Sequence, residues 1–352
     1  MIKVLVVDDS LFMRTLISDI LNSDPEIEVV DTAKEGREAL IKISKLRPDC
    51  ITLDLAMPGW NGLTTLKHII AEYPTPVVIL SAHSKKDSDI TMECLYAGAI
   101  GFVLKPSGEL SLDVEKVKHQ ILDEVKAAAK VDVRKIKSFE PKAHPPLKEI
   151  SHKPKEIRRK FTATNKIVII GSSTGGPQTL ELILSYLPVN FPAPIIVVQH
   201  IPSNFFSHSL AEHLNHICEI QVKVIESNEN IKSGIVYLIP SGFRLLINQI
   251  GMKEIITFLQ REEPDILTPS IDFAMKTIVE IYKENSIGIV LTGMGHDGVQ
   301  GMKAIKEAGG NTIVQDNSSL IFGMPKAVID AGYADIVLPA PEIPKCMVKY
   351  VS

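Results

Sequence analysis

The sequence predicts an α/β protein with two domains, each built on a mostly parallel sheet. Three observations in the 352-residue chain support this fold class. Short apolar runs alternate with amphipathic stretches from residue 2 to about 128, and a second alternating series begins at about residue 165. The stretch between them is rich in lysine, arginine and proline and poor in aliphatic residues. Alternating strand and helix patterns give parallel sheets covered by helices, and this chain length suits two domains.

The first series predicts a doubly wound (βα)5 domain over residues 1–126. Each apolar run is followed by a stretch with helical spacing. The connection between parallel strands is nearly always right-handed, so the helices cover both faces of the sheet. The expected strands are residues 3–9, 27–33, 50–57, 76–82 and 101–106.

The pattern stops over residues 127–163, which we interpret as a linker. This stretch is basic and contains several prolines, a composition typical of an exposed and flexible connection. A basic stretch of this kind could also bind an acidic partner, but a solvated linker is the simpler interpretation.

The second series, residues 164–352, predicts another α/β domain, mostly parallel, with an antiparallel insertion. The insertion is residues 244–260, where two strand-like runs flank Gly251 as in a β-hairpin. The other expected strands are residues 166–171, 194–200, 220–226, 234–240, 286–293, 311–316 and 335–339.

Composition argues against several classes of protein. The net charge of −4 gives no support to nucleic-acid binding. No apolar run reaches the ~18 residues that span a bilayer, so we expect no membrane insertion. The N-terminus, MIKVLVVDDS, turns acidic where a secretory signal would stay apolar, and we therefore expect a cytoplasmic protein.

Cysteine and histidine spacing gives little support to a zinc site. The cysteines lack CxxC spacing, and the first two lie among apolar neighbours that predict a core position. The four are Cys50, Cys94, Cys218 and Cys346. His213 and His216 could share a helix face as metal ligands, but a partly exposed polar face is the simpler interpretation.

Charged and hydroxyl side chains end the strands of the first domain. Asp8 and Asp9 end the first expected strand, and Asp54 ends the third. Ligands of open α/β sheets bind at the carboxyl ends of strands, and carboxylates that converge there repel one another unless a cation such as Mg²⁺ lies between them. Ser81 and Lys105 end the fourth and fifth strands and could contact a phosphoryl group. Helix capping would explain Asp9 alone but not the whole set.

These residues make the first domain similar to a known family. Residues 1 to about 125 resemble the receiver domain of response regulators, which is flavodoxin-like, through VVDDS, LDLAMPG and VLKP. The resemblance implies that Asp54 accepts a phosphoryl group from a histidine kinase. The implied Mg²⁺ ligands are Asp8, Asp9, Asp54 and the backbone of Ala56. The sequence departs from the family at WNG, residues 60–62, and at Ala56, but neither change removes a phosphorylation residue.

The second domain begins with a glycine-rich turn. Residues 171–175, G-S-S-T-G, fit the pattern G-x-S-x-G centred on Ser173 at a predicted strand-to-helix turn. Glycines permit the tight turn of a nucleophile elbow, and the helix N-terminus beyond it offers free amides to a developing negative charge. The pentapeptide alone leaves two alternatives open. One is a phosphate-binding turn, although the lysine of a GKS-type loop is missing, and the other is a turn that only permits close packing.

A base and an acid follow other strands of the second domain. His200 ends the run PIIVVQH, and Asp297 lies in the glycine-rich turn TGMGHDG. We expect His200 to take the proton from Ser173 and Asp297 to orient the imidazole, as in a serine–histidine–aspartate triad. His296 is a competing base, although side chains adjacent in sequence usually diverge.

Five motifs of the second domain also resemble a known family. GSSTGGP, QHIP, TPSID, LTGMGHDG and FGMPKA stand in order over residues 171–327, as in the catalytic domain of the chemotaxis protein-glutamate methylesterase family, CheB. That family joins a receiver to this domain through a linker, so the resemblance covers nearly the whole chain. The implied catalytic triad is Ser173, His200 and Asp297. The resemblance also implies that the Met294 amide helps to hold the oxyanion, with Thr174 near the site, and that His296 is not essential.

The resemblance implies a phosphorylation-activated hydrolase. The expected substrate is a methylated glutamate on a chemoreceptor, from which hydrolysis releases methanol, and receptor glutamines would be deamidated at the same site. The expected partners are methyl-accepting chemoreceptors and a chemotaxis histidine kinase. Mg²⁺ is expected to serve the receiver alone, with no cofactor for the esterase chemistry, and a monomer is the default expectation. Our hypothesis is that the receiver covers the Ser173 pocket until Asp54 is phosphorylated.

Overall fold

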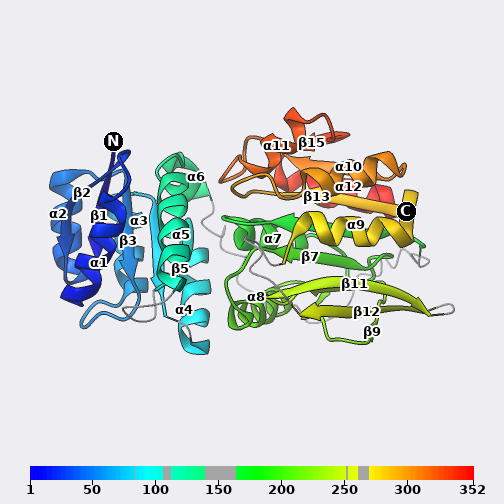
Figure 1. Ribbon diagram of the computed structural model, residues 1–352, viewed down its shortest axis with the longest axis horizontal. Helices are drawn as coiled ribbons and strands as arrows, with labels where there is room; N and C mark the ends of the chain where they lie inside the picture. Colours follow the sequence, from blue (N-terminus) through cyan, green and yellow to red (C-terminus); the bar gives the residue numbers. More distant parts are fainter. Residues whose placement is uncertain (83, 106–111, 139–163, 251–252, 261–268) are drawn as a thin grey trace, which may run out of the picture. The chain divides into compact units, whose positions relative to one another are not determined.

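The computed structural model describes residues 1–82, 84–105, 112–138, 164–250, 253–260 and 269–352. The chain divides into two units, Met1–Pro141 and Lys142–Ser352 (Figure 1). Each unit contains a parallel sheet with helices between the strands, and the second also contains a small antiparallel sheet. The predicted fold class is therefore confirmed.

The N-terminal unit contains a five-stranded parallel sheet in the order β2-β1-β3-β4-β5. Its strands are β1 (Ile2–Val7), β2 (Ile27–Ala33), β3 (Cys50–Asp54), β4 (Val77–Ser81) and β5 (Gly101–Leu104). Its helices are α1 (Leu11–Asn22), α2 (Gly36–Leu46), α3 (Gly62–Glu72), α4 (Lys85–Tyr96) and α5 (Leu112–Ala128). The chain changes direction across the sheet at β1, which lies between β2 and β3, and ligands of such sheets bind at the carboxyl ends of the strands at that point.

Burial and capping explain these elements. Every residue of β3 and β4 is buried, as expected of central strands covered on both faces, and the predicted core residues Cys50 and Cys94 are buried as well. Ser10 caps α1, and Asn61 caps α3 by accepting a hydrogen bond from the amide of Thr64 at 2.9 Å. Both caps lie in loops that follow strands β1 and β3, and α1 begins at Leu11, shortly after Asp8 and Asp9.

Helical segments fall within residues 127–163, the stretch predicted as a linker. It includes the end of α5 and the short helix α6 (Val133–Ser138). Ala128 and Val131 are buried, whereas a solvated linker would expose them. Residues 139–163, the rest of that stretch, lie outside the described residues.

The C-terminal unit contains a seven-stranded parallel sheet in the order β15-β14-β13-β6-β7-β10-β8. Its strands are β6 (Ile167–Ser172), β7 (Ile195–Gln199), β8 (Gln221–Val224), β10 (Ile235–Leu238), β13 (Ser286–Val290), β14 (Asn311–Gln315) and β15 (Ile336–Leu338). Its helices are α7 (Gly176–Leu184), α8 (Asn204–Ile217), α9 (Ile271–Tyr282), α10 (Val299–Glu307), α11 (Met324–Asp330) and α12 (Ile343–Val351), with short 3-10 helices η1 (Lys283–Asn285) and η2 (Ala340–Glu342). Among the described residues, no helix is both long enough and apolar enough to cross a membrane.

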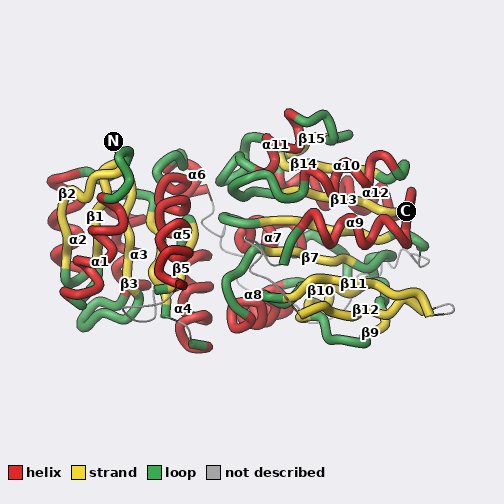
Figure 2. The backbone as a smooth tube through the Cα atoms, in the orientation of Figure 1, coloured by secondary structure: helices red, strands yellow, loops and turns green. Residues whose placement is uncertain are grey.

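The antiparallel insertion forms a separate three-stranded sheet (Figure 2). β11 (Phe243–Ile250) pairs along its whole length with β12 (Lys253–Gln260), which also pairs with β9 (Glu229–Asn230). The predicted hairpin is therefore confirmed. Its expected turn at Gly251 lies outside the described residues.

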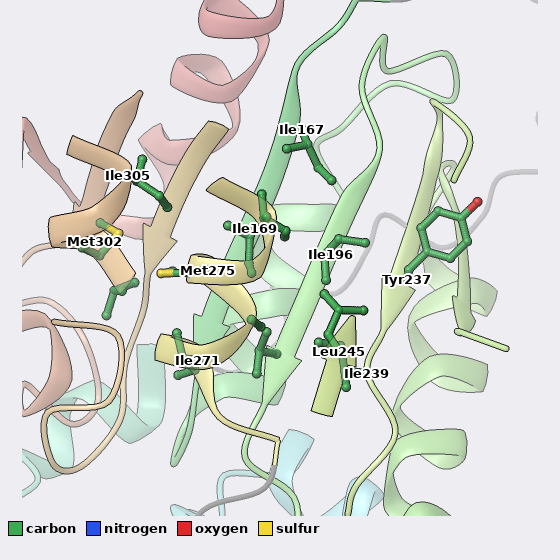
Figure 3. Packing of buried hydrophobic residues seen from close by; sticks show 14 of the residues in the cluster. Ile167, Ile169, Ile196, Tyr237, Ile239, Leu245, Ile271, Met275, Met302 and Ile305 are labelled. Atoms are coloured by element: carbon green, nitrogen blue, oxygen red, sulfur yellow. The ribbon is translucent and has the colours of Figure 1, made fainter. Parts of the chain in front are cut away.

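Helix α9 packs against β6, β13 and α10, and its first residue, Ile271, lies against Gly171 near the carboxyl end of β6. Ile271 and Met275 of α9 lie beside Ile169 of β6 in a buried cluster (Figure 3). Glycines permit this close approach. A Cβ at Gly171 would lie 2.5 Å from a methyl carbon of Ile271, and one at Gly301 would lie 2.5 Å from the Cβ of Met275. Packing through these glycines places the first turn of α9 next to the end of β6.

Candidate functional site

The N-terminal unit brings an acidic cluster together at the carboxyl ends of β1 and β3. Carboxylate oxygens of Asp8, Asp9 and Asp54 all lie within 4.8 Å of one another. Lys105 bridges two of them, because its Nζ lies 2.7 Å from Asp8 Oδ2 and 2.7 Å from Asp54 Oδ1. The four side chains were predicted at one site from the ends of three strands, and the structure brings them together.

Burial and charge determine the electrostatics of this cluster. Asp8 is fully buried, and burial, aided by repulsion from Asp54, raises the pKa of Asp8 although Lys105 opposes the change. Burial would lower the pKa of Lys105, but its two carboxylate partners outweigh that effect and raise it. Three carboxylates and one ammonium group leave an excess of negative charge on oxygen ligands. This donor set fits Mg²⁺.

Ser81 and Ala56 flank the acidic cluster. Ser81 is the buried last residue of β4, and its hydroxyl accepts a hydrogen bond from Thr91 Oγ1 at 2.8 Å. The Ser81 hydroxyl donates to the carbonyl of Ala82 at 3.3 Å, and to contact a phosphoryl group it would have to donate to a phosphoryl oxygen in place of this carbonyl. Ala56 is exposed, and its amide donates to Asp54 Oδ1 at 3.3 Å, so its backbone lies next to the predicted phosphoryl acceptor.

Replacing Asp8 with asparagine should raise the melting temperature of the N-terminal domain by a few degrees at neutral pH in Mg²⁺-free buffer. The folded-state pKa of Asp8 is raised above 3.8, so the stability contributed by its protonated form is lost as the pH rises through the folded-state pKa. Asparagine mimics the protonated form. The gain should therefore shrink as the pH falls toward 3.8, the ordinary pKa of the side chain.

Thermal unfolding across the acid-to-neutral range measures this difference. The exposed neighbour supplies the matched control, because Asp9→Asn removes the same charge without relieving a buried carboxylate. A lower melting temperature for Asp8→Asn at neutral pH would contradict the prediction.

Ser173 lies in a tight turn between β6 and α7. The turn ends at Gly175, whose φ of +77° is a left-handed conformation that favours glycine. Ser173 is partly exposed, whereas its neighbours Ser172 and Thr174 are buried. Of the three hydroxyl groups in the turn, that of Ser173 is the one accessible to a substrate. Beyond it, the amide of Gly176 donates to the carbonyl of Ser173 at 2.8 Å, and Pro177, the second residue of α7, has no N–H.

The strand order places His200 beside this turn. β6 and β7 are neighbours, and their pairing ends with Ser172 opposite Gln199, so Ser173 and His200 are the next residues of adjacent strands. The amide of His200 donates to the carbonyl of Ser172 at 3.0 Å. The nucleophile and the base predicted from sequence are therefore one residue beyond the ends of paired strands.

Asp297 lies in the loop between β13 and α10, and its carboxylate binds His200. Asp297 Oδ2 lies 2.9 Å from His200 Nε2. Four further donors surround the carboxylate: the amides of Ile271 (2.8 Å), Asp272 (2.9 Å) and Gly298 (3.1 Å) and the hydroxyl of Ser270 (3.3 Å). Burial would raise the pKa of Asp297, but these hydrogen bonds, led by that of His200, outweigh it and lower the pKa. Asp297 is therefore held ionised and in one orientation.

Asp272 is a residue of this site that sequence analysis did not assign. Its Oδ1 accepts hydrogen bonds from the amides of Gly298 at 2.9 Å and Gly301 at 2.6 Å. It thereby caps α10, whose own N-cap residue is Gly298. Burial and the charge of Asp297 raise the pKa of Asp272. The motif TPSID contains this carboxylate and was the signal that could have identified it.

The loop before Asp297 packs against the serine turn. A Cβ at Gly293 would lie 2.6 Å from the Cβ of Ser173, so glycine is required for this approach. Thr292 Oγ1 donates to the carbonyl of Thr174 at 2.9 Å. These contacts hold the loop that contains Met294, the residue after Gly293, against the turn that contains Ser173 and Thr174.

Two other histidines of the C-terminal unit, His296 and His213, were considered from the sequence, and their surroundings differ from those of His200. His296 is exposed while Asp297 is buried, so the two adjacent side chains diverge as expected. His213 Nε2 lies 3.0 Å from Glu181 Oε2, which joins α8 to α7. Within the described part of the chain, no cluster of metal-ligating side chains includes His213.

Two family models match this chain, and named relatives align with it along nearly their whole length. Residues 168–347 match the family model of the CheB methylesterase, and residues 4–115 match that of the response regulator receiver domain. The protein-glutamate methylesterase/protein-glutamine glutaminase of Thermotoga maritima is 41% identical over 354 residues, covering 99% of this chain and 98% of that protein. The protein of the same name from Archaeoglobus fulgidus is 42% identical over 351 residues, covering 99% of this chain and 98% of that protein.

A solved structure shows the same likeness for the second domain. The crystal structure of the Thermotoga maritima CheB methylesterase catalytic domain is 44% identical, has a TM-score of 0.52, and covers 54% of this chain and 100% of that chain. Relatives of this identity match along nearly their whole length. The chain therefore belongs to the protein-glutamate methylesterase/protein-glutamine glutaminase family, with a response regulator receiver domain followed by a CheB methylesterase domain.

Proposed function

We propose that the C-terminal domain hydrolyses glutamate γ-methyl esters on methyl-accepting chemoreceptors and deamidates receptor glutamines at the same site. The names of its relatives support the reaction class. The observation that carries the proposal is the hydrogen bond between His200 Nε2 and Asp297 Oδ2, beside the accessible Ser173. A serine, an imidazole and a carboxylate at one edge of a sheet are the parts of a nucleophilic acyl transfer.

The partner of His200 determines which ring nitrogen acts as the base. An ionised carboxylate can only accept a hydrogen bond, so Nε2 of His200 carries the proton directed at Asp297. In the neutral imidazole the lone pair is then on Nδ1. Nδ1 is therefore the proposed proton acceptor for Ser173. This is the reverse of the usual serine-protease arrangement, in which Nε2 faces the serine.

Ser173 is the proposed nucleophile. As its Oγ bonds to the ester carbonyl carbon, its proton moves to His200 Nδ1. The imidazolium then gives this proton to the departing methoxide oxygen, methanol leaves, and the glutamyl group stays on Ser173. Water attacks the acyl group with the same proton acceptor, which frees the glutamate carboxylate and restores the serine. Asp297 stabilises the imidazolium in both steps, because its lowered pKa keeps it ionised.

A backbone amide is the proposed stabiliser of the oxyanion. The proposed donor is the amide of Met294, in the loop that packs against the serine turn, with Thr174 next to Ser173. The contact of Gly293 with Ser173 and the hydrogen bond from Thr292 to the Thr174 carbonyl hold this backbone in place. Donors fixed before the reaction stabilise developing charge without a cost of reorganisation.

Asp54 is the proposed phosphoryl acceptor of the receiver, with a chemotaxis histidine kinase as the donor. Lys105 Nζ, 2.7 Å from Asp54 Oδ1, is placed to pair with a phosphoryl group on that side chain. The proposed Mg²⁺ ligands are Asp8, Asp9, Asp54 and the carbonyl of Ala56. When bound there, Mg²⁺ would neutralise charge on the phosphoryl oxygens.

Asp54→Ala should abolish the response of the esterase to phosphorylation. We expect wild-type methanol release to accelerate when a small-molecule phosphodonor and Mg²⁺ are added, because phosphorylation shifts a two-state equilibrium toward the active form. In Asp54→Ala the ratio of the rates with and without phosphodonor should fall to one. Asp19→Ala is the matched control, since it removes an exposed carboxylate of the same domain. Stimulation that survives in Asp54→Ala would contradict the assignment.

Methanol release from receptor membranes tests the proposed activity. Membranes whose receptors carry radiolabelled methyl esters are incubated with the purified full-length protein, and volatile radioactivity is measured. We expect release by the wild-type protein, with faster release after phosphorylation. If the esters stay intact with and without phosphodonor, the esterase assignment is refuted, and a phosphorylation-switched binding protein is the remaining function.

A further inference from the structure

The side chain of Gln199 joins the serine turn to the histidine. Gln199 is the last residue of β7 and is 5% exposed. Its Nε2 donates to the carbonyl of Ser173 at 2.8 Å and to the carbonyl of His200 at 3.1 Å. Its Oε1 accepts from Ser172 Oγ at 2.6 Å. Both N–H groups and the oxygen of this buried amide therefore have partners in the two segments that carry the nucleophile and the base.

These hydrogen bonds continue the pairing of β6 and β7 beyond its end. Regular pairing stops at Ser172 and Gln199, and both Ser173 and His200 lie outside the strands. The backbones contribute the bond from the His200 amide to the Ser172 carbonyl at 3.0 Å. On its other side, the amide of Ser173 donates to the carbonyl of Thr292 at 3.0 Å. With Gln199 in place, the Ser173 peptide is held from both neighbouring strands.

The second glycine after Thr174 provides the space for this amide. A Cβ at Gly176 would lie 1.9 Å from Gln199 Oε1 and 2.8 Å from its Cδ. Gly175 has a positive φ, but Gly176 does not, so backbone conformation does not require glycine at position 176. The two adjacent glycines of GSSTGGP are therefore required for different reasons: Gly175 for the conformation of the turn, and Gly176 for the space that the side chain of Gln199 occupies.

We propose that Gln199 is a positioning residue of the esterase, whose amide sets the separation and orientation of Ser173 and His200. The proposal rests on the proposed function, because that function gives Ser173 and His200 their roles. Gln199 acts through two carbonyl groups and not on the substrate. A displacement of about 1 Å between reacting groups can lower a rate by about 10²-fold. Loss of the amide should therefore lower kcat and leave KM unchanged.

Gln199→Glu tests the donors, because it keeps the shape of the side chain and replaces the NH₂ group by oxygen. We expect kcat for ester hydrolysis to fall by about 10²-fold with KM within about twofold of wild type. The rate at which a fluorophosphonate labels Ser173 should fall in parallel. In that labelling Ser173 Oγ bonds to phosphorus, fluoride leaves, and the serine proton passes to His200. Labelling thus measures the geometry of nucleophile and base without the ester substrate.

Gly176→Ala provides an independent way to displace the amide, because the new Cβ would occupy the position of Gln199 Oε1. It should reproduce the loss of kcat and of labelling. The double variant Gly176→Ala/Gln199→Ala should be no slower than Gln199→Ala, because the clash is gone once the side chain is removed. Additive losses would overturn the proposal.

Thr312→Val is the matched control for stability. It removes a buried hydroxyl that donates to Asp335 Oδ2 at 2.8 Å, near the start of β14 and away from the carboxyl edge of the sheet. We expect a lowered melting temperature with normal kcat. The proposal is overturned if Thr312→Val slows catalysis as much as Gln199→Glu and Gln199→Ala, or if those two variants keep most of the wild-type kcat and labelling rate. Absence of methyl-ester hydrolysis in the wild type would refute the proposed function, while labelling would still decide the role of Gln199.

Discussion

Ser173→Ala is expected to lower kcat for methyl-ester hydrolysis by about 10⁶-fold, the loss typical when the serine of a catalytic triad is removed. The substitution removes the atom that forms the acyl-enzyme. His200 and Asp297 would still be in place, but they would have to activate a water molecule that nothing holds against the ester. The measurement is release of radiolabelled methanol from receptor membranes, together with fluorophosphonate labelling, which should disappear.

The neighbouring serine supplies a matched control for this variant. Ser172 is buried, and its hydroxyl donates to Gln199 Oε1 at 2.6 Å, so it cannot reach a substrate. Ser172→Ala removes one hydrogen bond and should lower kcat by less than about tenfold. Equal losses in the two alanine variants would contradict the assignment of the nucleophile to Ser173.

Asp297→Asn is expected to lower kcat by about 10⁴-fold, as when the aspartate of a triad is replaced by its amide. The NH₂ group of the new asparagine would donate a hydrogen bond to His200 Nε2. Nε2 would then have to accept, so it could no longer hold the single N–H proton of the neutral imidazole. That proton would move to Nδ1, the nitrogen proposed to accept the proton of Ser173. The histidine would be present but in the wrong tautomer, so kcat should fall far more than KM changes.

Folding must be checked separately for this variant, because Asp297 Oδ2 also accepts a hydrogen bond from the amide of Ile271 at 2.8 Å. Rates are therefore compared well below the melting temperature of each protein. Asp272→Asn is the matched control, since it neutralises the adjacent half-buried carboxylate while an amide oxygen can still accept from Gly298 and Gly301. Its kcat should stay within about tenfold of wild type. A comparable loss in both variants would show that total charge, not the tautomer of His200, controls the rate.

The receiver site could be predicted from sequence because its determinants are local. Asp8, Asp54 and Lys105 each lie at or just beyond the end of an apolar run, and parallel strands carry their carboxyl ends to one edge. The apolar runs and the polar residues that follow them can be identified from the sequence without knowledge of any long-range contact. The hydrogen bond from Thr91 to the Ser81 hydroxyl could not be predicted from the sequence, because Thr91 belongs to the next helix and contacts Ser81 through packing.

The esterase site shows more clearly what sequence patterns lack. His200 and His296 were both available as bases, and the structure separates them by burial and by hydrogen bonding to Asp297. Gln199 and Asp272 received no role from the sequence. Each has hydrogen-bonding partners more than 25 positions away in the chain, so these roles depend on how the chain packs.

The sequence alone determined where strands end and which side chains stand there, because periodicity, glycine turns and helix caps depend on residues close together in the chain. Only the tertiary structure decided which of those ends meet. The order β13-β6-β7 puts the Ser173 turn between the strands that lead to Asp297 and His200. The hydrogen bond between His200 and Asp297 joins residues 97 positions apart. Strand order is set by packing of the whole domain, and no local pattern in the chain encodes it.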